Sequence, residues 1–122
     1  MHNIVTVQNV RSLEYTALVD LMHDIYTKEV PETRVDMGVN LTQIEELMIF
    51  FSNQYAFIIE LWATMVHEVR LLKRASKEKA VIDQAMDKRD YLEKVMSATK
   101  LKYFSTSRLL KHHQNEMDMR YE

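Results

Sequence analysis

The 122-residue sequence predicts an all-α fold in one domain. A short N-terminal helix precedes two long helices that pair as an antiparallel hairpin or bundle, assembled into a helical homo-oligomer. Only one glycine, Gly38, and one proline, Pro31, occur, and both lie in the segment 30–40. A β-rich fold needs several clusters of turn residues, whereas many Leu, Met, Glu, Lys, Gln and Arg residues with little Gly or Pro favour helix. The segment 30–40 is therefore predicted to link the first two helices.

The first helix is predicted over 12–29. Its apolar residues recur at spacings of three and four, as in an amphipathic helix. They are Leu13, Ala17, Leu18, Leu21, Met22 and Ile25. Pro31 ends this helix, because the residue before a proline avoids the α-helical region. Residues 1–11 are predicted to be a tail or a short extended segment.

The second helix, predicted over 41–74, has the clearest periodicity. Asn40 is a favourable N-cap, and Gln43 completes a capping-box pattern. Apolar residues at alternating steps of four and three form a heptad seam, which predicts coiled-coil packing in the core or between subunits. This seam consists of Ile44, Met48, Phe51, Tyr55, Ile58, Trp62, Met65, Val69 and Leu72. A second stripe makes the helix apolar on most of its surface, and it consists of Leu47, Phe50, Phe57 and Leu61.

That apolar surface has three explanations. Residues 47–66 contain a single formal charge, Glu60, and basic residues follow from Arg70 onward, as in a membrane span with a positive flank. The polar residues Asn53 and Gln54 near its middle argue against a span. The helix is otherwise buried by its own chain in a monomer or by other subunits in a homo-oligomer, and we favour the homo-oligomer.

The third helix is predicted over 77–113, followed by a tail over 114–122. The apolar pattern weakens at 73–80, so a turn there, with Ser76 as a helix cap, and one continuous helix both remain open. The seam of the third helix has small and polar members, which indicates a less buried covering helix. It comprises Val81, Ala85, Leu92, Val95 or Met96, Thr99, Tyr103 and Leu110.

The charges are sorted along the chain. Residues 70–111 carry twelve Lys and Arg against five Asp and Glu, a balance of +7, whereas residues 1–69 carry three against ten, a balance of −7. The acidic half is also the more apolar, so we assign it to assembly and the basic half to contact with a polyanion. Two alternatives stay open: the basic face neutralises the acidic half within the fold, or opposite charges join subunits head to tail.

Cations flank the aromatic residues of the basic half. Cations next to aromatic side chains are suited to binding single-stranded nucleic acid, because the cations contact the phosphates while an aromatic face stacks on any base. The predicted nucleic-acid-binding residues are Arg70, Lys73, Arg74, Lys77, Lys79, Lys88, Arg89, Tyr91, Lys94, Lys100, Lys102, Phe104, Arg108 and Lys111. Phe104 fits a core position equally well.

Motifs for catalysis and metal binding are absent from the sequence. The chain has no cysteine, and His23-Asp24 and His67-Glu68 lack the further ligands of metal-dependent hydrolases. It also lacks a Gly-rich phosphate loop and the spaced acidic motifs of nucleotide pyrophosphohydrolases. We therefore expect no enzyme activity, no metal site and no cofactor. The first residues have no signal-peptide features, so a cytoplasmic location is expected.

The order of these parts resembles the UvsY-type recombination mediators of phages. The shared pattern is a short helix, a long apolar helix with Trp62 in its middle, and a Lys/Arg-rich connection over 70–79. A charged helix follows, in which Lys88-Arg89-Asp90-Tyr91-Leu92 precedes Leu101-Lys102-Tyr103-Phe104. The resemblance implies a cytoplasmic, ring-like homo-oligomer that binds single-stranded DNA and helps to load a recombinase, displacing or remodelling a single-strand-binding protein.

Two functions follow from the sequence. The first is a non-enzymatic, phage-encoded accessory protein that binds single-stranded nucleic acid, with itself and a recombinase or other protein as further partners. The alternative is a phage-encoded protein-interaction module that modulates a host enzyme or serves as an assembly component, with the acidic half as its working surface. A single-span membrane protein is the weakest candidate.

Overall fold

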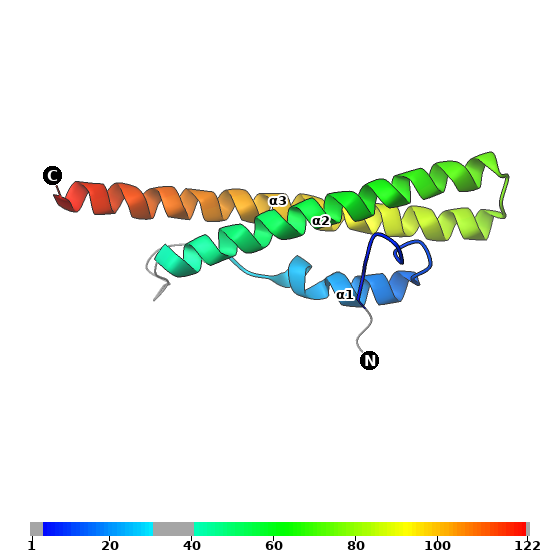
Figure 1. Ribbon diagram of the computed structural model, residues 1–122, viewed down its shortest axis with the longest axis horizontal. Helices are drawn as coiled ribbons and strands as arrows, with labels where there is room; N and C mark the ends of the chain where they lie inside the picture. Colours follow the sequence, from blue (N-terminus) through cyan, green and yellow to red (C-terminus); the bar gives the residue numbers. More distant parts are fainter. Residues whose placement is uncertain (1–3, 31–40, 122) are drawn as a thin grey trace.

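A computed structural model describes residues 4–30 and 41–121, with side chains described as far as residue 115. Three helices follow in order, α1 (Tyr15–Thr27), α2 (Leu41–Arg74) and α3 (Lys79–Tyr121), and no strand occurs in these ranges. The two long helices pack against each other as an antiparallel hairpin, and α1 lies alongside it (Figure 1). The predictions of an all-α fold and of two paired long helices are confirmed.

The core between α2 and α3 follows the heptad seam of α2. All nine seam residues predicted for this helix are buried or half-buried, and Phe51, Ile58 and Met65 are completely inaccessible. The chain itself therefore covers this seam, as the monomer explanation requires. Within the described ranges, none of the helices carries a stretch whose length and hydropathy suit a bilayer crossing.

The seam of α3 differs from the predicted one. Its inward positions alternate in steps of three and four and include several polar side chains: Ala85, Lys88, Leu92, Val95, Thr99, Lys102, Thr106 and Leu109. Three predicted members fail: Val81 is 42% exposed, and Tyr103 and Leu110 are half-buried beside the inward positions of Lys102 and Leu109. The buried hydroxyls of Thr99 and Thr106 donate to the carbonyls of the preceding helical turn, at 2.7 and 2.8 Å, so their burial leaves no donor unpaired.

A turn, not a continuous helix, joins α2 to α3. Ser76 has a φ of 52°, in the left-handed region that usually requires glycine. Its N–H donates to the Lys73 carbonyl, and the Lys77 N–H donates to the Leu72 carbonyl, both at 3.1 Å. This pair of bonds is a Schellman motif, so Ser76 ends α2 and does not cap α3 as predicted. The carbonyl of Glu78 accepts the first bonds of α3.

The N-terminal segment is folded, which corrects the predicted tail over 1–11 within the described part. The Thr6 N–H donates to Asn9 Oδ1 at 2.7 Å, and the Asn9 N–H donates to Thr6 Oγ1 at 3.1 Å, closing a compact turn. This turn buries Val5 and Val10 against the hairpin. We call residues 4–30 the arm.

The arm continues into α1, which starts three residues later than predicted. Leu18, Met22 and Ile25 are buried in the same core cluster as residues of α2 and α3. The outward positions Asp20 and Asp24 are exposed. The stripe predicted for this helix is therefore its buried face.

Two further predicted boundaries have different outcomes. The helix α3 continues to Tyr121, so its predicted end at 113 and the tail over 114–122 are wrong. Polar residues such as Gln114 and Asn115 carry the helix onward although they present no apolar stripe. The linker, with Pro31 and the Asn40 cap, lies outside the described residues.

Candidate nucleic-acid interface

The structure divides the predicted nucleic-acid-binding residues into two groups. Nine cations are exposed: Arg70, Lys73, Arg74, Lys77, Lys79, Lys94, Lys100, Arg108 and Lys111. Phe104 is 48% exposed, so it is not a core residue. The remaining four face other parts of the protein to different extents: Lys88 is buried, and Arg89, Tyr91 and Lys102 are half-buried.

Lys88 holds the part of the arm that directly precedes α1. Its Nζ donates to the carbonyls of Val10, Arg11 and Leu13 at 3.0, 2.7 and 2.9 Å, which uses all three ammonium hydrogens. The residue is only 5% exposed, and its burial lowers the pKa of the ammonium group, while the Glu68 carboxylate opposes that shift. These bonds also explain why α1 starts at Tyr15 and not at residue 12. In a helix that began at residue 12, the Leu13 carbonyl would accept a backbone N–H of that helix, whereas here it accepts from Lys88.

Lys102 binds the other end of α1. Its Nζ donates to the carbonyls of Ile25 and Tyr26 in the last turn of α1, and the Ile25 carbonyl also accepts the Lys28 N–H. Burial lowers the pKa of Lys102, while Glu29 opposes the shift. The two lysines are fourteen residues apart, about 21 Å along α3, and the 13 residues of α1 span about 20 Å. The spacing of the lysines therefore matches the length of α1.

Tyr91 lies between these lysines and contacts two tyrosines of α1. Its ring centroid is 5.9 Å from that of Tyr15 and 6.4 Å from that of Tyr26. Burial raises the pKa of Tyr91, and Tyr15, Tyr26 and Asp20 add to the shift. Lys88, Tyr91 and Lys102 therefore serve intramolecular contacts in this fold, and we remove them from the predicted interface.

The exposed cations form two clusters instead of one track. Between Lys79 and Lys94, the outward face of α3 carries four exposed carboxylates, those of Asp83, Asp87, Asp90 and Glu93. Arg89 lies in this stretch and binds Asp90, with 2.9 Å between Nη2 and Oδ1. A polyanion following α3 would meet repulsion here, so Arg89 also leaves the interface.

The first cluster surrounds the turn of the hairpin, and we call it the tip cluster. It consists of Arg70, Lys73 and Arg74 at the end of α2, Lys77 in the turn and Lys79 at the start of α3. All five are exposed, and none forms an ion pair with another residue that the structure describes. Glu78 is the one acidic residue within 70–79, so the cluster has a balance of +4.

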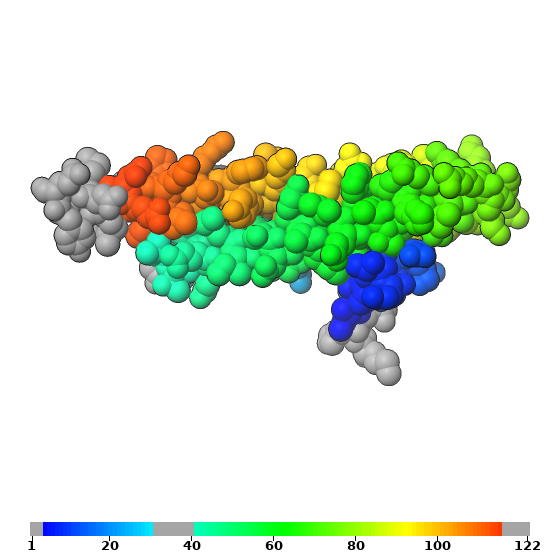
Figure 2. Space-filling model, turned by 45° about the horizontal axis from the view of Figure 1, so that its top comes forward, coloured from blue at the N-terminus to red at the C-terminus, as the bar shows by residue number. Residues whose placement is uncertain are grey.

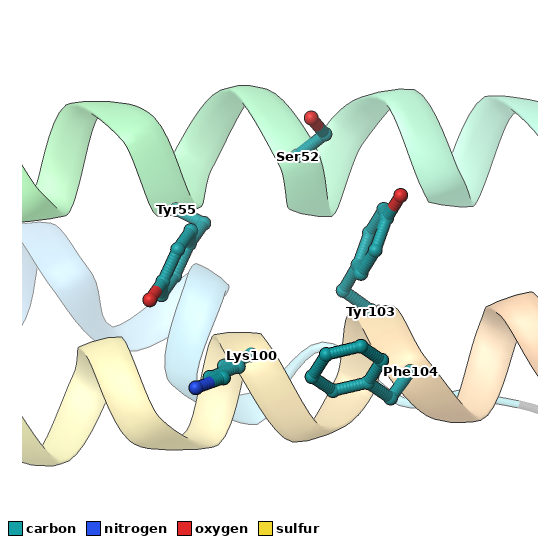
Figure 3. A pocket seen from close by; sticks show the side chains of 5 residues that line it. All are labelled: Ser52, Tyr55, Lys100, Tyr103 and Phe104. Carbon is teal, nitrogen blue, oxygen red and sulfur yellow. The ribbon is translucent and has the colours of Figure 1, made fainter.

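The second cluster lies along the C-terminal half of α3 and borders an aromatic groove. This groove, of about 140 Å³, is lined by Ser52 and Tyr55 of α2 and by Lys100, Tyr103 and Phe104 of α3. Tyr55 points from α2 towards α3, and Tyr103 points from α3 towards α2 (Figure 3). The Tyr103 and Phe104 rings meet edge to face, with centroids 5.8 Å apart. Lys94, Arg108 and Lys111 are exposed on the same helix.

The sequence pattern predicts Lys100 and Phe104 at the interface but not the other three residues of the groove. It assigns Tyr55 and Tyr103 to the helix seams and gives Ser52 no role. A signal was present, since a tyrosine at a seam position leaves its hydroxyl needing water or a partner, which favours the edge of the seam. Both tyrosines are half-buried at that edge.

Part of the hydrophobic surface that remains exposed lies near this groove. Leu101 is 68% and Ile49 61% exposed, and both precede groove residues by a few positions on their helices. Figure 2 shows the N-terminal turn of the arm against the tip half of the hairpin, while the first part of α2 lies beside the C-terminal half of α3. No group of three or more His, Asp or Glu side chains suited to a metal ion occurs among the described residues.

No protein-family model, curated protein or solved structure matches the chain.

Proposed function

We propose that the protein is a non-enzymatic accessory protein that binds single-stranded nucleic acid as a homo-oligomer, in the manner of a recombination mediator. The tip cluster carries this proposal. Five exposed cations without ion-pair partners among the described residues occupy one end of the hairpin. Unpaired cations that are free to displace counterions from phosphates supply most of the affinity of sequence-independent binding.

The helix termini at the tip affect the cations in two ways. Lys73 and Arg74 lie in the last turn of α2, where the helix dipole favours positive charge, so part of their role is structural. The N-terminus of α3 lies at the same corner, and its first N–H groups favour a bound anion. A phosphate at this corner would therefore meet both side-chain cations and helix amides.

A salt titration tests the proposal. We expect a labelled thymidine oligonucleotide to bind at low salt, with an affinity that falls by a log–log slope of about 0.7 for each phosphate contacted. Reversing the charges at Arg70, Lys73 and Arg74 should abolish this binding and leave the helical circular dichroism unchanged. A comparison variant reverses Arg108 and Lys111 of the second cluster, which are equally exposed but lie at the other end of the hairpin, and so separates the contribution of that cluster from that of the tip.

Two results contradict the proposal. Absence of binding to the unmodified protein, even at low salt, rejects the function itself. Retained affinity and slope in the tip variant move the site away from the tip cluster. Loss of affinity only in the comparison variant would assign the phosphates to the second cluster.

The homo-oligomer is a separate part of the proposal and has its own support. Ile49 and Leu101 remain exposed on one half of the hairpin, and exposed apolar side chains of this kind favour association. Mass measurement in solution by light scattering should give a multiple of the 14.5 kDa chain. A mass of one chain at all concentrations contradicts it.

The alternative, a protein-interaction module, is supported by the outer surface of the arm. Glu14, Asp20, Asp24 and Glu29 are all exposed there, next to Tyr15 and Tyr26, which are 42% and 45% exposed. Acidic side chains with exposed aromatic rings suit a basic protein partner. A pull-down with nuclease treatment separates the two functions: a stoichiometric protein that survives the nuclease favours the module, and loss of all partners favours nucleic-acid binding.

A further inference from the structure

We propose that the groove between Tyr55 and Tyr103 holds one base of the bound strand, stacked against the aromatic rings, while Lys100 binds the neighbouring phosphate. This inference rests on the proposed function and names a second contact for it, separate from the tip cluster. The occupant is a single-ring, pyrimidine-sized base carried on a phosphate chain. The size, lining and charge of the groove each support this choice.

The volume of the groove fits one six-membered ring. Its 140 Å³ is close to the roughly 150 Å³ cavity that is known to accept benzene in another protein. A larger apolar segment, such as a helix of another subunit, would present several side chains and needs a longer channel. The groove is bounded along the helices by two α2 residues and three α3 residues, about one turn of each helix.

The lining suits a flat ring. Three aromatic side chains contribute most of the wall, and Tyr55 and Tyr103 approach from opposite helices (Figure 3). The Ser52 hydroxyl and the tyrosine hydroxyls supply polar groups at the rim of an otherwise apolar wall. Stacking on such rings needs no particular hydrogen-bonding pattern, so either pyrimidine of a strand could occupy the groove.

The charge around the groove favours a polyanion over a neutral ligand. Lys100 is part of the wall, and it is the cation that lines the groove; Lys94 and Arg108, six and eight residues away, are also exposed but project about 120° and 80° around α3 from it. The acidic stretch that ends at Glu93 lies outside this part of α3. A base in the groove would therefore place a neighbouring phosphate near Lys100.

The groove lies far from the tip cluster. Lys79 and Lys100 are separated by 21 residues of continuous helix, about 32 Å. The contributions of the two contacts are therefore expected to be independent. Substitutions in the groove should lower the affinity for the strand. The part of the salt dependence that comes from the tip cations should stay the same.

The test compares two strands that differ only in their bases. Full-length protein is titrated with a labelled thymidine oligonucleotide of roughly twenty nucleotides, longer than common single-strand site sizes, and with an abasic strand of equal length. We expect the thymidine strand to bind about tenfold more tightly, the order expected for one stacked base. In a Tyr55→Leu, Tyr103→Leu, Phe104→Leu variant this ratio should fall to about one, because leucine keeps the apolar packing and removes the three stacking faces.

The matched control is Tyr15→Leu, Tyr26→Leu, which removes two exposed tyrosines outside the groove and should keep the tenfold ratio. Photo-crosslinking of the unmodified protein to a strand containing 5-bromouracil provides a measurement that does not depend on folding of the variant. The cross-linked peptides should contain Tyr55, Tyr103 or Phe104.

Several outcomes overturn the inference. Equal affinity of the unmodified protein for both strands means that no base is stacked, and it leaves the tip cluster as the binding site. A ratio that persists in the groove variant, or cross-links outside the groove, places the stacked base elsewhere. Thymidine monophosphate binding as tightly as the strand would assign the groove to free nucleotides. Failure of both strands to bind at low salt rejects the proposed function as well.

Discussion

Replacing Lys88 with methionine should release the arm from the hairpin. The substitution keeps an unbranched side chain, one heavy atom shorter, but removes three donors, leaving the carbonyls of Val10, Arg11 and Leu13 without their partner. The bond to Val10 is buried and the other two are partly buried, so water can replace some of what is lost. An unsatisfied buried acceptor costs about 1–3 kcal/mol, and a partly hydrated one costs less.

The desolvation of Lys88 works in the opposite direction. Burial lowers the pKa of its ammonium group, which means that the charged form is disfavoured in the fold, and methionine removes that penalty. Taken together, the free energy of unfolding should fall by about 2–3 kcal/mol. For a chain of this length each kcal/mol shifts the melting temperature by roughly 3–6 °C, so the expected decrease is about 10 °C.

Thermal and urea unfolding followed by circular dichroism measure this effect. Lys94→Met is the matched control, since Lys94 is exposed on the same helix and its replacement should change stability by less than about 0.5 kcal/mol. Hydrogen exchange should show that the loss of protection in Lys88→Met begins in α1. If Lys88→Met and Lys94→Met have the same melting temperature and the same urea midpoint, the three carbonyl bonds do not outweigh the cost of burying Lys88. The proposed role of Lys88 in holding the arm is then wrong.

Two further predictions concern local geometry. Ser76→Gly should raise the free energy of unfolding by about 0.5–1 kcal/mol, because glycine adopts the left-handed conformation at the end of α2 without a steric penalty, whereas Ser76→Val should lower it. Chemical denaturation of both variants checks this, and equal stability of the two contradicts the turn assignment. Trp62→Phe should lower the free energy of unfolding by no more than about 1–2 kcal/mol, because it removes some packing against the core but no hydrogen bond: the buried Trp62 Nε1 has no partner among the described residues. A loss of several kcal/mol in the same denaturation assay would show that the indole has an acceptor.

The sequence predicted α2 better than α3 for a physical reason. Ile44, Phe51 and Ile58 are apolar, and their regular spacing on α2 matches the face that is buried. In α3 the same spacing includes Lys88 and Lys102, which a hydropathy pattern assigns to the surface. Their partners are backbone carbonyls about 75 residues away in the sequence, and no local pattern encodes a carbonyl that is free to accept.

The sequence predicts which cations of the candidate interface are exposed at the tip, but it does not predict how residues from different helices come together in the groove. The exposed cations of the tip cluster follow directly from the charge run over 70–79. The groove was not foreseen, because it joins Tyr55 to Tyr103 across two helices whose register only the fold determines. Lys88 and Lys102 are two heptads apart and fall in register with Leu92 and Val95. This spacing could have predicted that both lysines face inward.

The antiparallel hairpin also changes the meaning of the charge split along the chain. Because Ser52 and Tyr55 lie opposite Lys100 and Phe104, residues earlier on α2, such as Glu45, lie opposite residues later on α3. At that end acidic α2 accompanies basic α3, whereas the tip cluster keeps its balance of +4. Opposite charges are thus already neighbours at that end of one chain, which weakens the electrostatic drive for subunits to join head to tail. A homo-oligomer would depend more on exposed apolar residues such as Ile49 and Leu101 than on the charge split, and its mass should be insensitive to salt.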